Sequence, residues 1–526
     1  MQLGLQFSLL LASLFVLLGG VEAAPVKRGG LVTLPLKRIT QTRSDLHPQV
    51  LLQQHINRGL KRHARMTGRD EPSALELRAN LHKRLYIPPG GRPGVRKANA
   101  KRYNRHGVAP ISDAVSEHND VIGVLANTLR QKGTGKGQKG QSAGGNGGGK
   151  GNATAAGSGG DQADGGAGFS EVDLDAENNG GLTAANAPTA DNSLGLDIEA
   201  NDVGYIATVQ LGTPPQDFKI LMDSGSADFW VGGEQCQSTE GGDCGNHTFL
   251  GTQSSSSFVD SGKQFAVTYG SGAVQGDIIT DNVNIAGLAL NQHTFGVTTQ
   301  ETDDFAADTV PFDGLMGLAQ SLLSEQGVPT PVESLASAGL ISDAITSFKI
   351  SRLADEKNDG EITFGGLDQT KFDPATLVTF DNVNQQGFWE GSMPSVTVNG
   401  QDLGLQGRTA ILDTGTTLVI APDADAAAVH AAIPGAKSDG QGGFTIPCTT
   451  TASVALTFGG QSFAIDPRDL LFAPVDPTDL TGDCVSGISS GQIGGATEWL
   501  VGDVFLKNAY FSTDTGKNQI SLAKLV

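Results

Sequence analysis

One short pattern occurs twice in the chain, and it constrains the fold more than any other feature. The segment LMDSGSADFWV at 221–231 is echoed by ILDTGTTLVI at 411–420, so an Asp-Ser/Thr-Gly-Ser/Thr turn follows two apolar residues in both places. A second element repeats in register, because Leu-Met-Gly at 315–317 and Leu-Val-Gly at 500–502 end 94 and 89 residues after the two aspartates. This repetition predicts two lobes built on one plan.

The residues around these repeats indicate β structure. From about residue 197 the chain consists of short runs such as YIATVQL, FKILMD and EITFGG, bounded by Gly, Asn, Asp and Pro, which is typical of an all-β protein. Helical patterns are few and short, the clearest being 331–340 and 423–433. We therefore expect an all-β domain with a few short helices and two lobes, at about 197–370 and 371–526.

The duplicated turn has a specific chemical capacity. Its apolar residues form a buried strand, its Gly permits a tight turn, and its hydroxyl groups donate hydrogen bonds to a carboxylate at the strand end. If a pseudo-twofold axis relates the copies, Asp223 and Asp413 meet, and two such neighbouring carboxylates cannot both ionise. The pair then shares one proton and can activate a water molecule. The alternative is two aspartates that only cap strand ends, which leaves the duplicated context to coincidence.

Five motifs between 197 and 526 resemble the pepsin family of aspartic endopeptidases, in particular its secreted fungal members. They are LGTPPQDFKILMDSGSADFWV, VTYGSGAVQGD, PFDGLMGLA, AILDTGTTLVIAP and WLVGDVFLKNAYFSTD. The resemblance implies a two-lobed pepsin-like fold with pseudo-twofold symmetry, hydrolysis of protein and peptide substrates, and no cofactor or metal. It also implies that Asp223 and Asp413 are the catalytic pair, supported by Ser224, Gly225, Ser226, Thr414, Gly415 and Thr416.

The segment around Tyr269 is the predicted lid of this site. A Tyr followed by Gly-Ser-Gly between β-branched runs is typical of a hairpin tip. Tyr269 and Gly270 also resemble the tip of the family's flap, a hairpin that closes over the substrate. A plain exposed hairpin is the alternative. Some fungal relatives carry Asp where this chain has Ser271 and accept Lys before the scissile bond. The resemblance therefore implies a preference for hydrophobic residues on both sides of that bond.

Three aromatic residues are candidates for the walls of the substrate site. Trp230 resembles the tryptophan whose indole N–H holds the flap tyrosine, although a simple core role is the alternative. Phe305 and Phe312 are candidate pocket walls, and packing in the core is an equal alternative for both.

Charge divides the chain into two opposite regions. The formal net charge is −20 overall, but residues 25–110 carry 19 Lys+Arg against 4 Asp+Glu, while residues from 197 onward carry 12 against 41. The acidic balance argues against a nucleic-acid partner. The basic region, 24–110, is either a solvated disordered arm or a prosegment that docks on the acidic domain and inhibits it; we favour the prosegment.

The segment 111–196 is predicted to be a Gly-rich linker or an extension of the prosegment. Within it, 133–168 contains 16 Gly in 36 positions, a composition that cannot bury enough apolar area to offset the entropy of ordering. The mature N-terminus could therefore lie anywhere between about 103 and 197.

The first residues indicate export. An apolar run at 3–20 precedes Val-Glu-Ala-Ala, as in a signal peptide that ends near residue 23; a membrane anchor is the alternative. We expect a secreted monomer without a membrane anchor, and a vacuolar destination fits the same signal. Sequons at Asn152 and Asn246 are compatible with glycosylation.

Export also permits disulfides. The four cysteines allow three pairings, and short loop closure favours Cys236–Cys244 and Cys448–Cys484. A zinc site is the alternative, but none of the spacings is the CxxC of such sites.

Two other functions remain as alternatives for the whole protein. One is a catalytically inactive pepsin-like binding protein, which is expected to have lost an Asp, a loop Gly or the flap Tyr. The other is a Gly-rich cell-wall protein, which does not need the duplicated motif.

Overall fold

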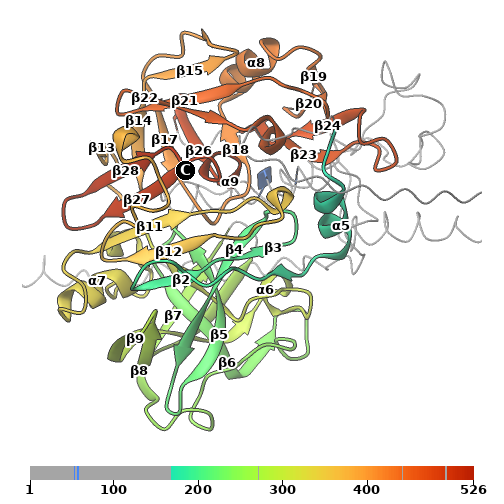
Figure 1. Cartoon of the computed structure of the whole chain (residues 1–526). Helices are drawn as coiled ribbons and strands as arrows, with labels where there is room; N and C mark the ends of the chain where they lie inside the picture. Colours follow the sequence, from blue (N-terminus) through green and yellow to red (C-terminus); the bar gives the residue numbers. More distant parts are fainter. Residues whose placement is uncertain (1–52, 54–55, 58–167, 270–271, 441, 492–494) are drawn as a thin grey trace, which may run out of the picture. The chain divides into compact units, whose positions relative to one another are not determined.

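The structure is a computed structural model that describes residues 53, 56–57, 168–269, 272–440, 442–491 and 495–526 (Figure 1). All described residues belong to one compact unit, Lys37–Val526. The predicted signal peptide at 1–23, nearly all of the predicted prosegment and Asn152 lie outside the described residues. Among the described residues, no helix is long and apolar enough to cross a membrane.

The N-terminal half of the described chain forms a nine-stranded sheet. Strand β4 shows why these runs become strands: beyond Ala207, exposed Thr208 and Gln210 alternate with buried Val209 and Leu211, the period of two that a half-buried strand requires. In sheet order the strands are β1 (Leu182–Thr183), β3 (Asp197–Glu199), β4 (Gly204–Leu211), β5 (Gln216–Asp223), β10 (Gly314–Gly317), β6 (Phe229–Ser238), β9 (Leu288–Glu301), β8 (Ala273–Ile285) and β7 (Val259–Thr268).

A six-stranded sheet combines segments from distant parts of the chain. β2 pairs with β12, which pairs with β11, and β11 pairs with β27 close to the C-terminus. In sheet order its strands are β13 (Val378–Asp381), β28 (Gln519–Ala523), β27 (Tyr510–Asp514), β11 (Ile345–Lys349), β12 (Glu361–Phe364) and β2 (Ser193–Gly195). This sheet joins the two halves of the domain.

The C-terminal half contains three smaller sheets, drawn in orange to red in Figure 1. The five-stranded sheet consists of β14 (Glu390–Met393), β17 (Arg408–Leu412), β26 (Glu498–Val501), β18 (Val419–Ala421) and β25 (Ile488–Ser490). The two four-stranded sheets consist of β16 (Gln401–Asp402), β15 (Ser395–Val398), β21 (Val454–Phe458) and β22 (Gln461–Ile465), and of β19 (Lys437–Ser438), β20 (Phe444–Pro447), β24 (Asp483–Ser486) and β23 (Leu471–Pro474).

The described helices are short, as predicted. The patterns at 331–340 and 423–433 form α7 and α8. Helix α7 begins with a capping box: the Thr330 side chain accepts from the amide of Glu333, and the Glu333 side chain accepts from the amide of Thr330. The α-helices are α5 (Glu171–Asn179), α6 (Asp303–Ala306), α7 (Pro331–Ser337), α8 (Asp423–Ala431) and α9 (Asp503–Leu506), and the 3-10 turns are η3 (Ser321–Leu323), η4 (Leu353–Asp355), η5 (Pro374–Thr376) and η6 (Pro467–Leu470).

Regular structure begins before residue 197, within the segment 111–196 that we predicted to be a Gly-rich linker or an extension of the prosegment. Helix α5 is capped by Ser170, and Phe169, just before it, is 6% exposed within the main hydrophobic core. Strands β1 and β2 also precede residue 197 and pair with β3 and β12. The Gly-rich composition that indicates a linker ends at about residue 168, and the residues after it contribute to the sheets.

Candidate active site

The two Asp-Ser/Thr-Gly turns occupy equivalent places in the two halves. Asp223 ends β5, and β10 runs parallel to β5 with Gly317 opposite Asp223. Asp413 directly follows β17, and β26 runs parallel to β17 with Val501 opposite Leu412. In each half a third strand, β6 or β18, pairs antiparallel with the repeated apolar-apolar-Gly strand. Both duplicated sequence elements therefore contribute to the same local arrangement.

Reciprocal hydrogen bonds lock the two turns together. The amide of Ser224 donates to Thr414 Oγ1 at 2.9 Å, and the amide of Thr414 donates to Ser224 Oγ at 3.0 Å. Each hydroxyl then donates across the pair, Ser224 to the carbonyl of Leu412 at 3.0 Å and Thr414 to that of Met222 at 2.9 Å. Ser and Thr serve equally here because the bonds use only the hydroxyl group that both share.

Each aspartate is held in the same way by its own turn. The amides of Gly225 and Gly415 donate to Oδ1 of Asp223 and Asp413, both at 2.9 Å. The hydroxyls of Ser226 and Thr416 donate to the other carboxylate oxygen, Oδ2, at 2.5 and 2.6 Å. The two aspartates are 0% and 1% exposed. Two ordered, buried carboxyl groups are thus presented by loops related by internal symmetry.

The second duplicated element requires its glycines. A Cβ on Gly317 would lie 2.5 Å from backbone atoms of Ala227 and Asp228, and one on Gly502 would lie 1.9 Å from the carbonyl oxygen of Thr416. Neither gap leaves room for a side chain. The repeated glycine therefore lets this strand approach the turn that carries the neighbouring aspartate.

The predicted flap is a hairpin of β7 and β8. At its end the indole N–H of Trp230 donates to the Tyr269 hydroxyl at 2.7 Å, the contact that the resemblance implied. The amide of Tyr269 donates to the carbonyl of Gly272 at 2.6 Å, while Gly270 and Ser271 lie outside the described residues.

Phe305 and Phe312 lie with these two aromatic residues in a hydrophobic cluster separate from the main core. The Phe305 ring meets the rings of Trp230 and Tyr269 edge to face, with centroids 5.3 and 5.5 Å apart. Phe305 is 4% and Phe312 8% exposed. Phe305 therefore packs against the flap tyrosine, and Phe312 packs against Phe305, with ring centroids 6.3 Å apart.

The sequence reasoning missed a third acidic residue near the pair, Asp503. It follows Gly502 at the start of α9, it is 0% exposed, and neither of its carboxylate oxygens has a hydrogen-bond partner among the described residues. Burial raises the pKa of Asp503 well above its ordinary value of 3.8; Lys507 opposes this shift, while the negative charge of Asp413 adds to it. The Asp directly after the repeated apolar-apolar-Gly was the available signal.

A hollow of about 640 Å³ lies apart from these residues. Its lining includes Arg352 and Lys507 but neither catalytic candidate. Both cations are already paired with the buried carboxylate of Asp469, at 2.6 and 2.9 Å. The hollow is therefore lined by a structural ion cluster and is separate from the candidate active site.

Both disulfides join the cysteines with the shorter loops, Cys236 to Cys244 and Cys448 to Cys484. The one cluster of potential metal ligands found among the described residues combines Cys236 and Cys244 with Glu301. Its two sulfur atoms are committed to the disulfide, so this cluster does not offer the thiolates that a zinc site uses.

The glycosylation candidate Asn246 is exposed, as a glycosylation site must be.

Two β lobes that each supply one interlocked Asp-Ser/Thr-Gly turn define the class of pepsin-like aspartic peptidases. The model of the family "Eukaryotic aspartyl protease" matches residues 204–525. The chain belongs to this family, and the predicted fold class and enzyme family are confirmed.

Curated relatives agree with the family match. The chain is 36% identical over 348 residues to a probable aspartic-type endopeptidase of Trichophyton verrucosum, 66% of each protein, so it spans just under two thirds of that relative. It is 34% identical over 343 residues to an aspartic-type endopeptidase of Aspergillus fumigatus, 65% of this chain and 70% of the relative. It is 35% identical over 328 residues to rhizopuspepsin of Rhizopus chinensis, 61% of this chain and 79% of the relative.

Proposed function

We propose that this chain is an endopeptidase that hydrolyses peptide bonds in proteins through a water molecule activated by Asp223 and Asp413. The observation that carries the proposal is the matched pair of turns, in which each carboxyl accepts one bond from a glycine amide and one from a hydroxyl. A catalytically inactive relative would have no need to keep both halves of this arrangement intact.

The chemistry follows from one proton shared by two carboxyl groups. The ionised member takes a proton from water as the water attacks the peptide carbonyl, and the protonated member donates a proton to the substrate. We assign the base role to the dyad as a unit. The bonds from Ser226 and Thr416 orient both carboxyl groups before substrate arrives.

The flap supplies the preference for apolar substrates. Tyr269 is held by Trp230, and Phe305 lies edge-on to both rings. A side chain next to the scissile bond would contact aromatic surface here and would lose little hydrogen bonding on leaving water, so we expect hydrophobic residues to be preferred on both sides of the bond.

The test is an acid-shift assay on the purified protein. Casein cleavage is followed at pH ~3.5 and ~7 with and without pepstatin, an inhibitor of aspartic peptidases. We expect cleavage at the acid pH alone, and its loss with pepstatin. Absence of cleavage at both pH values after removal of residues 24–110 would overturn the proposal and favour a binding protein.

We further propose that the chain is a secreted zymogen, with a signal peptide at 1–23 and an inhibitory prosegment at 24–110. The opposite charges of this segment and the acidic domain support docking near neutral pH. Acidification protonates surface carboxylates and weakens that attraction. The same proposal includes export as a monomer, to the medium or the vacuole, with a glycan at Asn246.

The structure supports a maturation cut upstream of Gly168. Phe169 is buried and its amide donates to the carbonyl of Leu480 at 2.9 Å, and β2 is an edge strand of the six-stranded sheet. A cut after this region would remove these contacts. N-terminal sequencing of the acid-activated protein is expected to find a start before 168; a start after 196 would refute this placement.

A further inference from the structure

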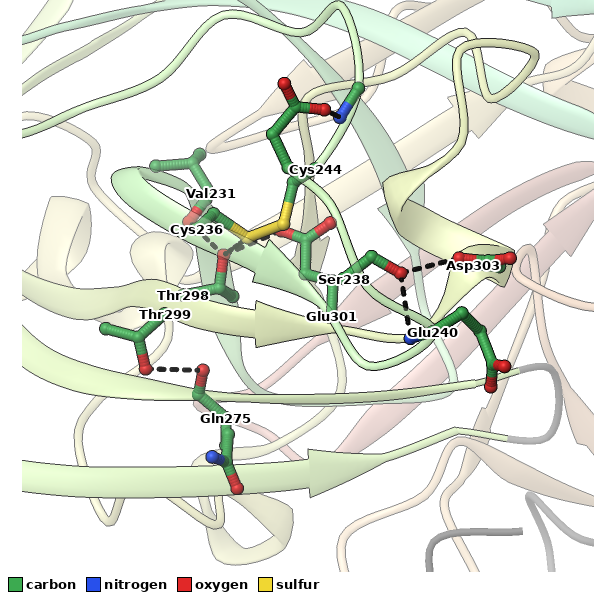
Figure 2. The surroundings of a disulfide bond; sticks show 12 residues. Val231, Cys236, Ser238, Glu240, Cys244, Gln275, Thr298, Thr299, Glu301 and Asp303 are labelled. Atoms are coloured by element: carbon green, nitrogen blue, oxygen red, sulfur yellow. Dashed lines mark hydrogen bonds between the residues drawn. A yellow bond between two sulfur atoms is a disulfide. The ribbon is translucent and has the colours of Figure 1, made fainter. Parts of the chain in front are cut away.

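A loop closed by a disulfide contacts helix α6, which carries Phe305 of the aromatic cluster. We call residues 236–248, which include the Cys236–Cys244 bond, the disulfide loop. Figure 2 shows this bond beside β9 and the start of α6, with Ser238 directed at Asp303. The segment that follows β9, residues 302–313, contains both Phe305 and Phe312; we call it the wall segment.

The disulfide loop contacts the wall segment along most of its length. Both cysteines are buried in one small cluster with Ala306. A Cβ on Gly245 would lie 2.4 Å from the carbonyl oxygen of Ala306, so the two backbones are in direct contact. Further along, the amides of Asn246 and Thr248 donate to the side chains of Asp308 and Asp313, at 3.0 and 2.8 Å.

Ser238 makes the contact that fixes the start of α6. Its hydroxyl donates to Asp303 Oδ1 at 2.6 Å and accepts from the amide of Glu240 at 3.2 Å, and the residue is 8% exposed. Helix α6 has four residues, and so short a helix is not stable without external contacts. Its position therefore depends on neighbours such as Ser238.

On its other side the wall segment is joined to the flap. The amide of Ala273, on flap strand β8, donates to Thr302 Oγ1 at 3.1 Å, and the amide of Thr302 donates to the carbonyl of Ala273 at 3.0 Å. One turn later the Phe305 ring meets Tyr269 and Trp230. A displacement of α6 thus moves the aromatic surface and the tip end of the flap together.

We propose that the disulfide loop is a positioning element for the substrate site, and that Ser238 is a positioning residue that acts through Asp303 on Phe305. Ser238 thereby affects substrate specificity, that is, which side chain the enzyme accepts next to the scissile bond. The chemistry of the Asp pair is left unchanged, because both catalytic turns lie on other strands. This inference rests on the proposed function, since it takes Phe305 to be a wall of the substrate site.

The test compares Ser238→Ala with Ser257→Ala. Ser257 is a matched control because its hydroxyl also donates to an aspartate, Asp281, at 2.5 Å, and its hydrogen-bond partners lie outside the wall segment. Two peptides that differ only in carrying Phe or Ala before the scissile bond are hydrolysed at acid pH. We expect Ser238→Ala to lower kcat/KM for the Phe peptide about fivefold, chiefly through KM, with a smaller effect on the Ala peptide.

Two further results are expected from the same set of variants. Asp303→Asn keeps an oxygen that can accept from Ser238, so it should stay close to the wild-type ratio of the two peptides. Amide hydrogen exchange in 302–313 should be faster in Ser238→Ala than in Ser257→Ala, and this readout does not require turnover.

Equal effects of Ser238→Ala and Ser257→Ala on the peptide ratio and on exchange would overturn the inference. A wild-type protein that cleaves neither peptide would instead overturn the proposed function, and the exchange measurement would still show whether Ser238 positions the wall segment.

Discussion

Asp503 gives the sharpest prediction of how stability depends on pH. Its carboxyl group is fully buried, both oxygens lack a hydrogen-bond partner among the described residues, and burial raises its pKa well above 3.8. Below the pKa of the unfolded chain the group is protonated in both states and contributes no pH dependence. Above that pKa the unfolded chain releases a proton that the folded protein retains, so stability falls as pH rises, until the folded pKa is reached.

The size of this effect follows from the proton count. One retained proton lowers the free energy of unfolding by about 1.4 kcal/mol for each pH unit. The measurement covers pH ~4 to ~6, where the unfolded chain loses this proton while the folded protein, whose pKa is raised, retains it, so the loss grows with each pH unit. Asp503→Asn removes the titration. The stability of Asp503→Asn relative to wild type should therefore increase across this range by the amount that the wild type loses. The cost of burying the amide is the same at every pH and does not change this trend.

Urea denaturation measures this difference, with the fluorescence of the three buried tryptophans, Trp230, Trp389 and Trp499, as the signal. Asp423→Asn, an exposed position in the first turn of α8, is the control for the substitution itself. A difference between Asp503→Asn and wild type that stays constant within about 0.5 kcal/mol over the range would refute the reasoning.

Three further predictions concern the scaffold. Burial raises the pKa of Glu301 to about 7, so wild-type stability should fall between pH ~4.5 and ~7, and Glu301→Gln should remove up to about 3 kcal/mol of that loss in urea titrations at several pH values. Thr330→Ala breaks the capping box with Glu333 and should cost about 1 kcal/mol in the same denaturation assay. Gly317→Ala places a methyl group 2.5 Å from the backbone of Ala227 and should lower the melting temperature measured by calorimetry; an unchanged value would contradict the close approach.

The sequence was most informative where residues repeat. The two Asp-containing turns predicted two lobes and a joint site, because a pattern that occurs twice in register implies symmetry without any knowledge of side-chain contacts. The hydroxyls of Ser224 and Thr414 then interlock as the resemblance implied. The contact of Trp230 with Tyr269 was also found.

Other features depend on contacts between residues far apart in sequence. Asp503 becomes unusual only because the fold buries it beside other carboxyl groups. Ser238 and Asp303 are 65 positions apart, and no local pattern connects them. Helix α5 was hidden by the Gly-rich composition just before it, and its neighbour Phe169 reaches the core only through long-range packing.

The most direct test of the central claim is the kcat of Asp223→Asn and Asp413→Asn, measured at acid pH on protein whose fold is verified by circular dichroism. Asn keeps the size of the side chain and an acceptor oxygen, but it cannot exchange the shared proton. We predict that either substitution lowers kcat by at least about a hundredfold, while Asp423→Asn leaves it unchanged. A folded Asp223→Asn or Asp413→Asn variant that cleaves peptides near the wild-type rate would contradict the account.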